Sequence, residues 1–460
     1  MAGTAKRDSW KWWTTVLVVL VCLLANVGGA LAGDSVTPGP GGQALPAAPV
    51  LQADSGDTAW VLISAALVMF MTPGLAFFYG GLVRKKNMLS ILMQCFMILC
   101  LISVQWVLFG YSLAFGPDVK GIVGSLGWAG LSGVGLDPGS YAPHVPHQAF
   151  MIFQMMFAVI TPGLIIGAFA ERMKFTGFCV FTLLWATLVY DPVCHWVWGE
   201  GGFLRQMGVQ DFAGGIVVHI NAGLAALAAA LVLGRRQGYP KVISPPHNLP
   251  FAVIGAAMLW FGWFGFNAGS ALGAGKVATN AFVATHTAGA VAGLTWALME
   301  WLLIRRPTML GMITGCVAGL AAVTPAAGYV NAMGAMAIGV GSGAICYLSV
   351  SFVKARLQYD DSLDAFGVHG VGGIWGTLAL GIFATKSVNP DSANGLLYGG
   401  SSLMLAQLTA VGVTLAYSFV ATLLLLKAVN WVTKLRVSEQ DERIGLDLTQ
   451  HREAGYTLID

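Results

Sequence analysis

The sequence predicts an all-α polytopic membrane protein: eleven transmembrane helices in two inverted five-helix repeats plus a final helix, with a cleavable N-terminal signal peptide. Three observations predict this class. The chain of 460 residues is 56% hydrophobic and only 10% charged, whereas a soluble domain carries about 25% charged residues. Runs of about 20 apolar residues, enough to cross a bilayer, fill most of residues 57–431. The 60 glycines favour close packing of membrane helices.

The N-terminal segment has the three parts of a secretory signal: a basic head, an apolar middle and a small-residue end. Ala30-Leu31-Ala32 matches the A-x-A pattern of a cleavage site, although a retained twelfth helix is the alternative. We therefore expect four regions. They are a signal peptide (1–32), an external Gly/Pro-rich leader (33–56), a membrane domain (57–431) and a cytoplasmic tail (432–460).

The eleven apolar runs follow one another closely along the membrane domain. They begin near Asp57, Met88, His147, Thr176, Phe212, Leu249, Val277, Thr308, Gly328, Ala365 and Leu403. Basic residues concentrate in alternate loops, for example Arg84 to Lys86 and Arg235 with Arg236. By the positive-inside rule these loops are cytoplasmic. We expect a multi-pass protein of the bacterial inner membrane, with the mature N-terminus outside and the C-terminus in the cytoplasm.

An internal repeat joins two segments, DFAGGIVVHIN in about the fifth span and DAFGVHGVGG in about the tenth. Each runs from an aspartate through small residues to a histidine, His219 or His369. Residues 71–81 of the first span resemble residues 260–270 of the sixth in the same way. Halves of five spans must insert with opposite orientation, and such repeats place a transport route at their interface. The two histidines are therefore expected to meet near the bilayer midplane.

These histidines lie in segments too apolar for an unpaired polar group. Ionisable side chains inside a membrane need a partner or a wet cavity. Each histidine could be structural, with its ring bonded to a backbone carbonyl. We favour the alternative, in which His219 and His369 share a hydrogen bond and line a narrow pore. Because burial disfavours the charged imidazole, such a pair would offer a donor and an acceptor to a small neutral molecule.

The distribution of acids and cysteines excludes several other sites. Asp211 and Asp364 precede helices and are predicted to be N-caps. No carboxylate is expected at the midplane, where ion channels and Na⁺-coupled carriers commonly use charged rings, carbonyl cages or acids. The seven cysteines contain no C-x-x-C pair. We therefore predict neither a disulfide framework, nor a metal site, nor a cofactor.

Aromatic residues gather near the outer ends of several predicted spans. The set, with one serine, is Phe153, Phe157, Trp198, Trp263, Phe266 and Ser270. Singly, each aromatic residue is typical of an interfacial belt or of core packing. Together they could cage a cation, because aromatic faces attract a desolvated cation by about 2 kcal/mol or more. The serine hydroxyl could accept a hydrogen bond from the same cation.

A cation cage, a dry aromatic gate and a neutral histidine pair impose one requirement on the substrate. It must arrive as a cation and cross as a neutral molecule, because a charge is costly in an apolar pore. Ammonium meets this requirement, whereas K⁺ has no proton to lose. The proton would either stay outside or cross separately through the histidines, which can relay protons.

Several segments resemble signatures of the ammonium transporter family. They are FYGGLVRKKN, GAFAERMKF, DFAGGIVVHINAG, PHNLP, GWFGFNAGS, VTPAAGY and DAFGVHGVGGIWG. The resemblance extends from about Asp57 to the tail. It implies an eleven-span fold with inverted halves and a homotrimer with one pore in each subunit.

The resemblance also implies roles for individual residues. Phe153, Phe157, Trp198 and Ser270 would form the external recruitment site. Phe157 and Phe266 would stack as the gate, and Trp263, His219 and His369 would line the pore. Asp211 would hold the backbone of the recruitment site in place and add negative potential without binding the cation directly.

The tail, residues 436–456, resembles the family's cytoplasmic regulatory tail, to which a PII-type signalling protein binds in bacterial relatives. The ending HREAGY departs from the usual pattern, so a tail that only packs on the trimer is the alternative. For the whole protein, the alternatives are an ammonium sensor acting through the tail and a haem redox protein. Haem is disfavoured because the single histidine pair is crowded by Gly and Val. We expect a transporter, not an enzyme, with ammonium or ammonia and the lipid bilayer as partners and no nucleic acid.

Overall fold

The computed structural model describes residues 52–242 and 245–456. The predicted signal peptide and residues 33–51 of the predicted leader lie outside this range. The described chain is a bundle of helices with two small β-hairpins, each a separate two-stranded antiparallel sheet. The predicted all-helical membrane class is confirmed in this coarse form.

Eleven helices have more than ten residues within the described range. They are α2 (Ser55–Leu82), α3 (Met88–Gln105), α5 (His147–Phe169), α6 (Phe175–Trp185), α9 (Asn221–Leu233), α10 (Leu249–Ala268), α11 (Lys276–Ile304), α12 (Met309–Val323), α13 (Ala332–Leu348), α15 (Val371–Phe383) and α16 (Ser402–Thr433). The shorter helices are α4 (Tyr111–Phe115), α7 (Asp191–Trp198), α8 (Phe203–Gln206), α14 (Lys354–Leu357) and α17 (Glu439–Ile444).

Short π-helical and 3₁₀-helical turns lie between or extend these helices. The π-helical turns are η2 (Trp106–Gly110), η4 (Ala186–Tyr190), η5 (Gly215–Ile220), η7 (Ser349–Val353), η8 (Phe366–Gly370) and η10 (Asp447–His451). The 3₁₀ turns are η1 (Lys85–Asn87), η3 (Leu126–Leu131), η6 (Gly269–Ala271) and η9 (Leu396–Tyr398). The strands are β1 (Asp118–Val119), β2 (Val123–Gly124), β3 (Pro138–Gly139) and β4 (Ala142–Pro146).

Ten helical segments of the described chain are long and apolar enough to cross a bilayer. The sequence predicts eleven, and the eighth of these corresponds to α12. This helix has only 15 residues, fewer than the roughly 20 that a bilayer requires. It begins after the cap Thr308, whose hydroxyl accepts from the Gly311 amide at 2.9 Å. It ends before Thr324, and the following Pro325 has no backbone N–H with which to continue the helical hydrogen bonds.

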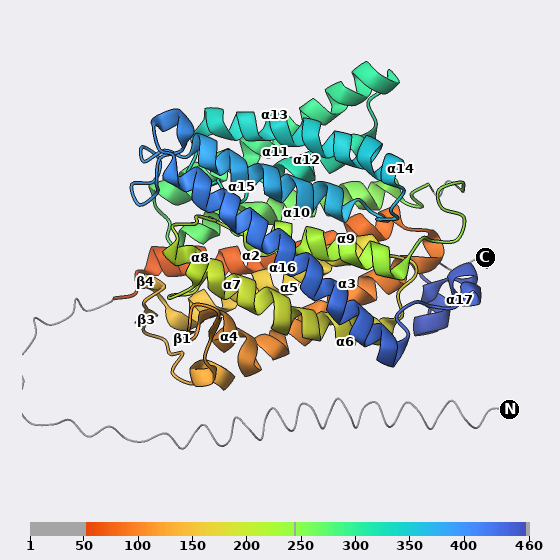
Figure 1. Cartoon of the computed structure of the whole chain (residues 1–460), viewed down its shortest axis with the longest axis horizontal. Helices are drawn as coiled ribbons and strands as arrows, with labels where there is room; N and C mark the ends of the chain where they lie inside the picture. Colours follow the sequence, from red (N-terminus) through yellow and green to blue (C-terminus); the bar gives the residue numbers. More distant parts are fainter. Residues whose placement is uncertain (1–51, 243–244, 457–460) are drawn as a thin grey trace, which may run out of the picture. The chain divides into compact units, whose positions relative to one another are not determined.

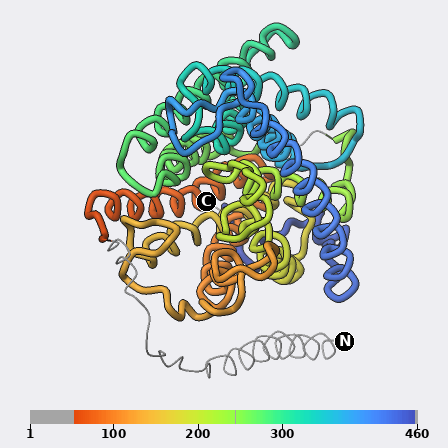
Figure 2. Tube along the Cα trace, turned by 60° about the vertical axis from the view of Figure 1, so that its left-hand side comes forward, coloured from red at the N-terminus to blue at the C-terminus, as the bar shows by residue number. Residues whose placement is uncertain are grey.

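The helices run between two ends of the bundle (Figure 1). β1, β3 and β4 lie at one end, which we call the hairpin end (residues 118–146), and α17 lies at the opposite end, which we call the tail end (residues 434–456). In Figure 2 the red α2 runs between the orange helices of the first half and the green helices of the second.

The first helices of the two predicted halves, α2 and α10, pack closely against each other. A Cβ atom on Gly81 would lie 2.5 Å from the Asn248 carbonyl oxygen and 2.6 Å from the Ala252 amide. A Cβ atom on Gly255 would lie 2.6 Å from the Gly74 carbonyl oxygen. Only glycine permits this approach, which is the role predicted for small residues in the bundle.

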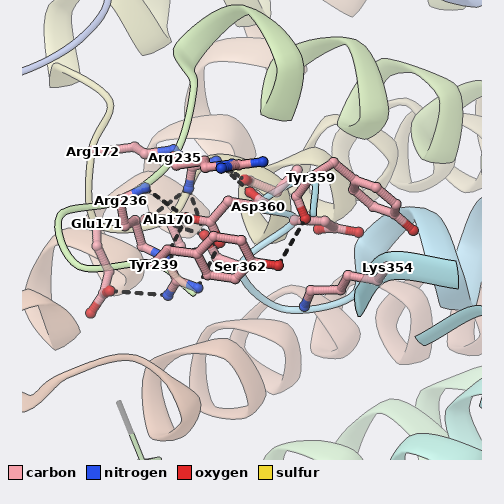
Figure 3. A network of polar contacts seen from close by, with 12 residues as sticks. Ala170, Glu171, Arg172, Arg235, Arg236, Tyr239, Lys354, Tyr359, Asp360 and Ser362 are labelled. Carbon is pink, nitrogen blue, oxygen red and sulfur yellow. Dashed lines mark hydrogen bonds and ion pairs between the residues drawn. The ribbon is translucent and has the colours of Figure 1, made fainter. Parts of the chain in front are cut away.

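A polar network ties three loops together at the tail end (Figure 3). Arg236 NH2 lies 2.8 Å from Asp360 Oδ1, and Arg236 NH1 lies 3.2 Å from Glu171 Oε2. Glu171 is also paired with Arg84, whose Nε lies 2.9 Å from Glu171 Oε1. Arg172 is fully buried and donates to the Ala168 and Asp360 carbonyls and to the Ser362 hydroxyl. The network positions the loop that leads into η8.

The arginines control the ionisation of both buried carboxyls. Burial by itself raises the pKa of the Glu171 carboxyl, but the hydrogen bonds and charges of Arg84 and Arg236 outweigh it and hold that pKa below its ordinary value. Burial likewise raises the pKa of Asp360, and the hydrogen bonds of Arg236 and the charge of Arg172 outweigh it. Both carboxylates are therefore ionised at neutral pH and stabilise the folded protein there.

We expect Arg236→Met to destabilise the protein by about 3–5 kcal/mol, because it leaves the buried Asp360 carboxylate without its partner. The measurement is thermal unfolding of purified protein in detergent. Because the folded-state pKa values are lowered, the wild-type advantage is present at neutral pH and is lost as the pH falls below about 4. The matched control is Arg235→Met, because this neighbour is exposed and bonds only Gln358; an equal loss in both variants would contradict the prediction.

Candidate functional site

Two histidine rings lie in parallel at the centre of the bundle. His219 lies on η5 and His369 on η8, and both side chains are buried. Their ring centroids are 5.2 Å apart and their planes differ by 12°. The two segments that resemble each other in sequence thus bring their histidines together, as the repeat predicts.

The contacts of these rings differ from both sequence-based interpretations. Within residues 52–242 and 245–456, three ring nitrogens have no hydrogen-bond partner: Nδ1 and Nε2 of His219, and Nδ1 of His369. In the described chain the expected hydrogen bond between the two imidazoles is absent, although their rings lie nearly parallel and close together. Bonds to backbone carbonyls, the structural alternative, are also absent for these atoms. Buried polar atoms without partners are costly, so the nitrogens are available to a small polar guest.

Asp211 holds the turn that carries His219. Its Oδ1 accepts from the amides of Gly214 (2.8 Å) and Gly215 (2.7 Å). Its Oδ2 accepts from the amides of Ile216 (2.7 Å) and Val217 (3.1 Å). Burial raises the pKa of the Asp211 carboxyl, although these four amides oppose the shift. Asp211 is therefore a cap, as its position before a helix predicts.

The second cap is Asp361 and not the predicted Asp364. Asp361 accepts from the amides of Ala365 (3.1 Å) and Phe366 (2.8 Å) at the start of η8. Asp364 has a positive φ of 61° and pairs with Lys354, whose Nζ lies 2.6 Å from Asp364 Oδ1. The sequence does contain a signal for the correct cap, because Asp361 precedes His369 by the same number of residues as Asp211 precedes His219.

Four of the predicted aromatic residues meet on the hairpin side of the histidines. The Phe157 and Phe266 rings are 4.3 Å apart between centroids and inclined by 39°. Phe157 also meets Phe153 at 5.0 Å and Trp198 at 5.8 Å. Trp198 Nε1 donates to the Asp211 carbonyl oxygen at 2.8 Å. The cap that orients His219 therefore also positions Trp198.

Ser270 lies on η6, directly after α10. Its hydroxyl donates to the Phe266 carbonyl oxygen at 2.9 Å. The hydroxyl oxygen can still accept a hydrogen bond, which is the role that the sequence suggests. A Cβ atom on the adjoining Gly269 would lie 2.9 Å from Phe153 Cε2. η6 therefore lies beside Phe153.

The aromatic residues continue into the histidine pair without a break. His219 lies 6.1 Å from Phe266 and 5.6 Å from Trp263 between ring centroids. Trp263 Nε1 donates to Thr324 Oγ1 at 2.9 Å, which fixes the indole. The line Phe157, Phe266, His219 and His369 joins the two predicted halves of the chain.

Two cavities meet at His369. The first measures about 10 Å³ and is lined by both histidines, Trp263 and Phe266, among others. This is close to the least space that holds one water molecule. The second, of about 270 Å³, lies towards the tail end and is lined by polar residues that include Glu300 and Asp364. The arrangement suits passage of one small neutral molecule from a dry constriction into a polar chamber.

His147, a histidine to which the sequence assigned no role, has a conventional partner. His147 begins α5, and its Nε2 lies 2.6 Å from the Tyr111 hydroxyl. No sequence signal indicated this contact, because Tyr111 is remote in the chain. Among the described residues, no group of three His, Cys, Asp or Glu side chains is arranged to hold a metal ion.

Comparison with known proteins identifies extensive similarity. The model of the family described as Ammonium Transporter Family matches residues 59–456. An ammonium transporter of Bacillus subtilis (strain 168) is 51% identical over 401 residues, which cover 87% of this chain and 98% of the relative. Ammonium transporter Amt1 of Archaeoglobus fulgidus is 48% identical over 403 residues, covering 87% and 99%.

Solved structures agree with these sequence matches. Saccharomyces cerevisiae Mep2 superposes with a TM-score of 0.79 at 37% identity, over 84% of this chain and 88% of that one. Candida albicans Mep2 has a TM-score of 0.82 at 35% identity, over 88% and 94%. A structure described as a sensor Amt protein has a TM-score of 0.79 at 30% identity, over 86% and 98%.

Proposed function

Since this chain belongs to the ammonium transporter family, we propose that it moves ammonium across a membrane by conducting ammonia past His219 and His369. The observation that carries this proposal is the unbroken line from Phe157 to His369, in which buried ring nitrogens have no partner in the described chain. These nitrogens can exchange hydrogen bonds with one ammonia molecule in a cavity of about 10 Å³.

Recruitment takes place at the aromatic end of this line. Ammonium rests against Phe153, Phe157 and Trp198, whose faces attract a cation, and donates a hydrogen bond to Ser270. Asp211 is buried behind Trp198, whose indole N–H donates to the Asp211 carbonyl oxygen. From there it adds negative potential without contacting the cation directly. The carboxylate holds the backbone of the site while the aromatic faces bind the substrate.

Deprotonation accompanies entry into the constriction. The stacked Phe157 and Phe266 rings exclude water, and a full charge behind them would be uncompensated. Ammonium therefore releases its proton before the gate and passes His219 and His369 as ammonia. It then reaches the polar chamber of about 270 Å³ and is protonated again there. The released proton either remains outside or crosses separately through the histidines.

The topology follows from the charge pattern. The hairpin end is outside and the tail end is cytoplasmic, because Arg172 and Arg236 lie in the loops at the tail end, together with Arg84, which pairs with Glu171 there. α12 completes an eleven-span bundle of two inverted halves, and the signal peptide is removed. Three such chains form a trimer in the bacterial inner membrane.

A PII-type signalling protein is the partner proposed for the tail end. Leu446 and Asp447 of the tail bond the loop around Asn87 and Ser90, through the Leu446 amide to Asn87 Oδ1 and the Ser90 amide to Asp447 Oδ1, both at 2.8 Å. The tail thus lies on the loops that surround the exit. A tail that serves only for packing remains the alternative. A tail variant that loses binding of the PII-type protein but keeps transport would favour the signalling partner over packing alone.

The test of the proposed function is an ammonium pulse applied to reconstituted protein on a supported membrane. A current shows that net charge crosses. Internal alkalinisation without a current shows that ammonia crosses alone. Protein-free vesicles supply the background, and a response equal to this background would reject transport.

The recruitment site predicts a specific change in the same assay. Trp198→Leu should raise the half-saturating ammonium concentration by roughly 30-fold, because a desolvated cation–aromatic contact contributes about 2 kcal/mol. Trp431→Leu is the matched control, since Trp431 is 89% exposed at the end of α16. Equal effects of the two substitutions would contradict the cage.

A further inference from the structure

A pair formed by His195 and Asp118 lies near the recruitment site, and His195 is on α7, the same short helix as Trp198. His195 of α7 is fully buried, and its ring lies between two oxygen atoms. Its Nδ1 lies 2.9 Å from the carbonyl oxygen of Ala114, on α4. Its Nε2 lies 2.9 Å from Oδ1 of Asp118, on β1. Neither the transport pathway nor the tail network uses this pair.

Counting hydrogens determines the protonation state of this ring. A carbonyl oxygen only accepts hydrogen bonds, and an ionised carboxylate also only accepts them. Both ring nitrogens must then donate, which requires an imidazolium. A neutral ring would place a nitrogen lone pair 2.9 Å from one of the oxygens. Asp118 is 31% exposed, so water can solvate its carboxylate and keep it ionised.

The glycines of the segment WGEGG leave room for this pair, where a side chain would collide with it. A Cβ atom on Gly199 would lie 2.5 Å from His195 Nδ1. A Cβ atom on Gly201, which has a φ of +91°, would lie 2.5 Å from Asp118 Cβ. The Gly121 amide donates to both Asp118 oxygens, at 2.8 and 3.1 Å. The pair is therefore a built feature of the hairpin end.

Other charged groups surround α7 without contacting the ring. The ionisable side chains on the adjoining segments are Tyr111, Lys120, Tyr190, Glu200, Arg205, Asp211, His219 and Tyr417, with Asp191 and Cys194 on α7 itself. In the part of the chain that the structure describes, Asp118 alone among ionisable side chains lies within bonding distance of the His195 ring. The extra proton therefore belongs to the His195–Asp118 pair.

We propose that His195, held at both ring nitrogens, is a positioning residue for Trp198 and through it for ammonium recruitment. The inference rests on the proposed function. The two bonds of the ring attach α7 to α4 and to β1, and Trp198 ends that helix. Trp198 is otherwise held by Arg205 NH1, which donates to its carbonyl at 2.6 Å, and by the Asp211 carbonyl. A neutral ring keeps one bond and repels the other acceptor, so α7 and the indole shift.

The first measurement is ¹⁵N solid-state NMR of wild-type protein labelled at histidine. His195 is one of eight histidines, and comparison with His195→Gln assigns its signals. We expect a hydrogen on both ring nitrogens, as the two contacts to oxygen require. An unprotonated nitrogen at His195 overturns the proposal, and this readout does not depend on transport.

The second measurement is the half-saturating ammonium concentration together with the maximal rate of transport. Asp118→Asn and His195→Gln should raise the half-saturating concentration by roughly threefold to tenfold, the effect of one lost hydrogen bond, with little change in maximal rate. The matched control is Glu200→Gln, a nearby exposed acid, which should leave both quantities unchanged.

The outcomes separate this inference from the proposed function. An unchanged half-saturating concentration in Asp118→Asn overturns the inference while transport stands. A wild-type protein that gives no ammonium-dependent signal rejects the function instead. If His195→Gln does not fold, the histidine signals that shift in Asp118→Asn assign His195, and the half-saturating concentration of Asp118→Asn still decides the question.

Discussion

Replacing both pore histidines, in the double variant His219→Ala/His369→Ala, is expected to lower ammonium-driven transport by roughly 30- to 150-fold. The reason is that ammonia would cross the constriction without hydrogen-bond partners. Each lost bond costs about 1–1.5 kcal/mol, so the barrier rises by about 2–3 kcal/mol. The measurement is the current or internal pH change after an ammonium pulse.

The matched control for this variant is His286→Ala. His286 lies in a membrane helix but is exposed and packs against Trp260 and Phe264, away from the pore. It should leave transport unchanged. If the current disappears in the double variant while ammonia still enters, the histidines carry the proton and ammonia passes without them. Unchanged transport in the double variant would remove the histidines from the mechanism.

Removing the cap of the first histidine turn should have the largest effect on folding. In Asp211→Ala, four buried amides lose the carboxylate that accepts from them. Hydrogen bonds to charged groups contribute about 1.5–3 kcal/mol each, so leaving even two unreplaced costs about 3–6 kcal/mol. We expect a large fall in the thermal unfolding midpoint and loss of transport, because both His219 and Trp198 depend on this turn.

Asp57→Ala provides the comparison for this cap. Asp57 is another carboxylate at the hairpin end, but it accepts from the single amide of Ala274 and is only half-buried. Its removal should cost less than about 1 kcal/mol. If Asp211→Ala unfolds at the same temperature as Asp57→Ala, the four amide bonds do not hold the turn.

Local sequence was sufficient for the family and for the meeting of the histidines. Membership rested on motifs such as DFAGGIVVHINAG, and the family match over residues 59–456 confirms it. The two echoing segments carry His219 and His369, which lie 5.2 Å apart. Both inferences worked because a repeat and a motif are properties of residue order, which the sequence displays directly.

The length of α12 and the identity of the residue that caps η8 were not predicted from the sequence. The apolar run after Thr308 continues past residue 323, yet α12 stops there, where Pro325 has no backbone N–H to donate to the helix. Three aspartates precede η8, and hydropathy alone does not tell which one faces the amides. Asp361 does so, while Asp364 pairs with Lys354 of α14.

The sequence by itself determined the membrane class, the family and the residue types along the pathway, because these depend on composition, hydropathy and motif order. Only the tertiary structure decided how these residues meet. It stacked the two imidazoles without a hydrogen bond, selected Asp361 as the second cap and enclosed His195 between Ala114 and Asp118. Hydrogen-bond partners are chosen by distance and orientation across helices remote in the chain, and those depend on packing that no local pattern encodes.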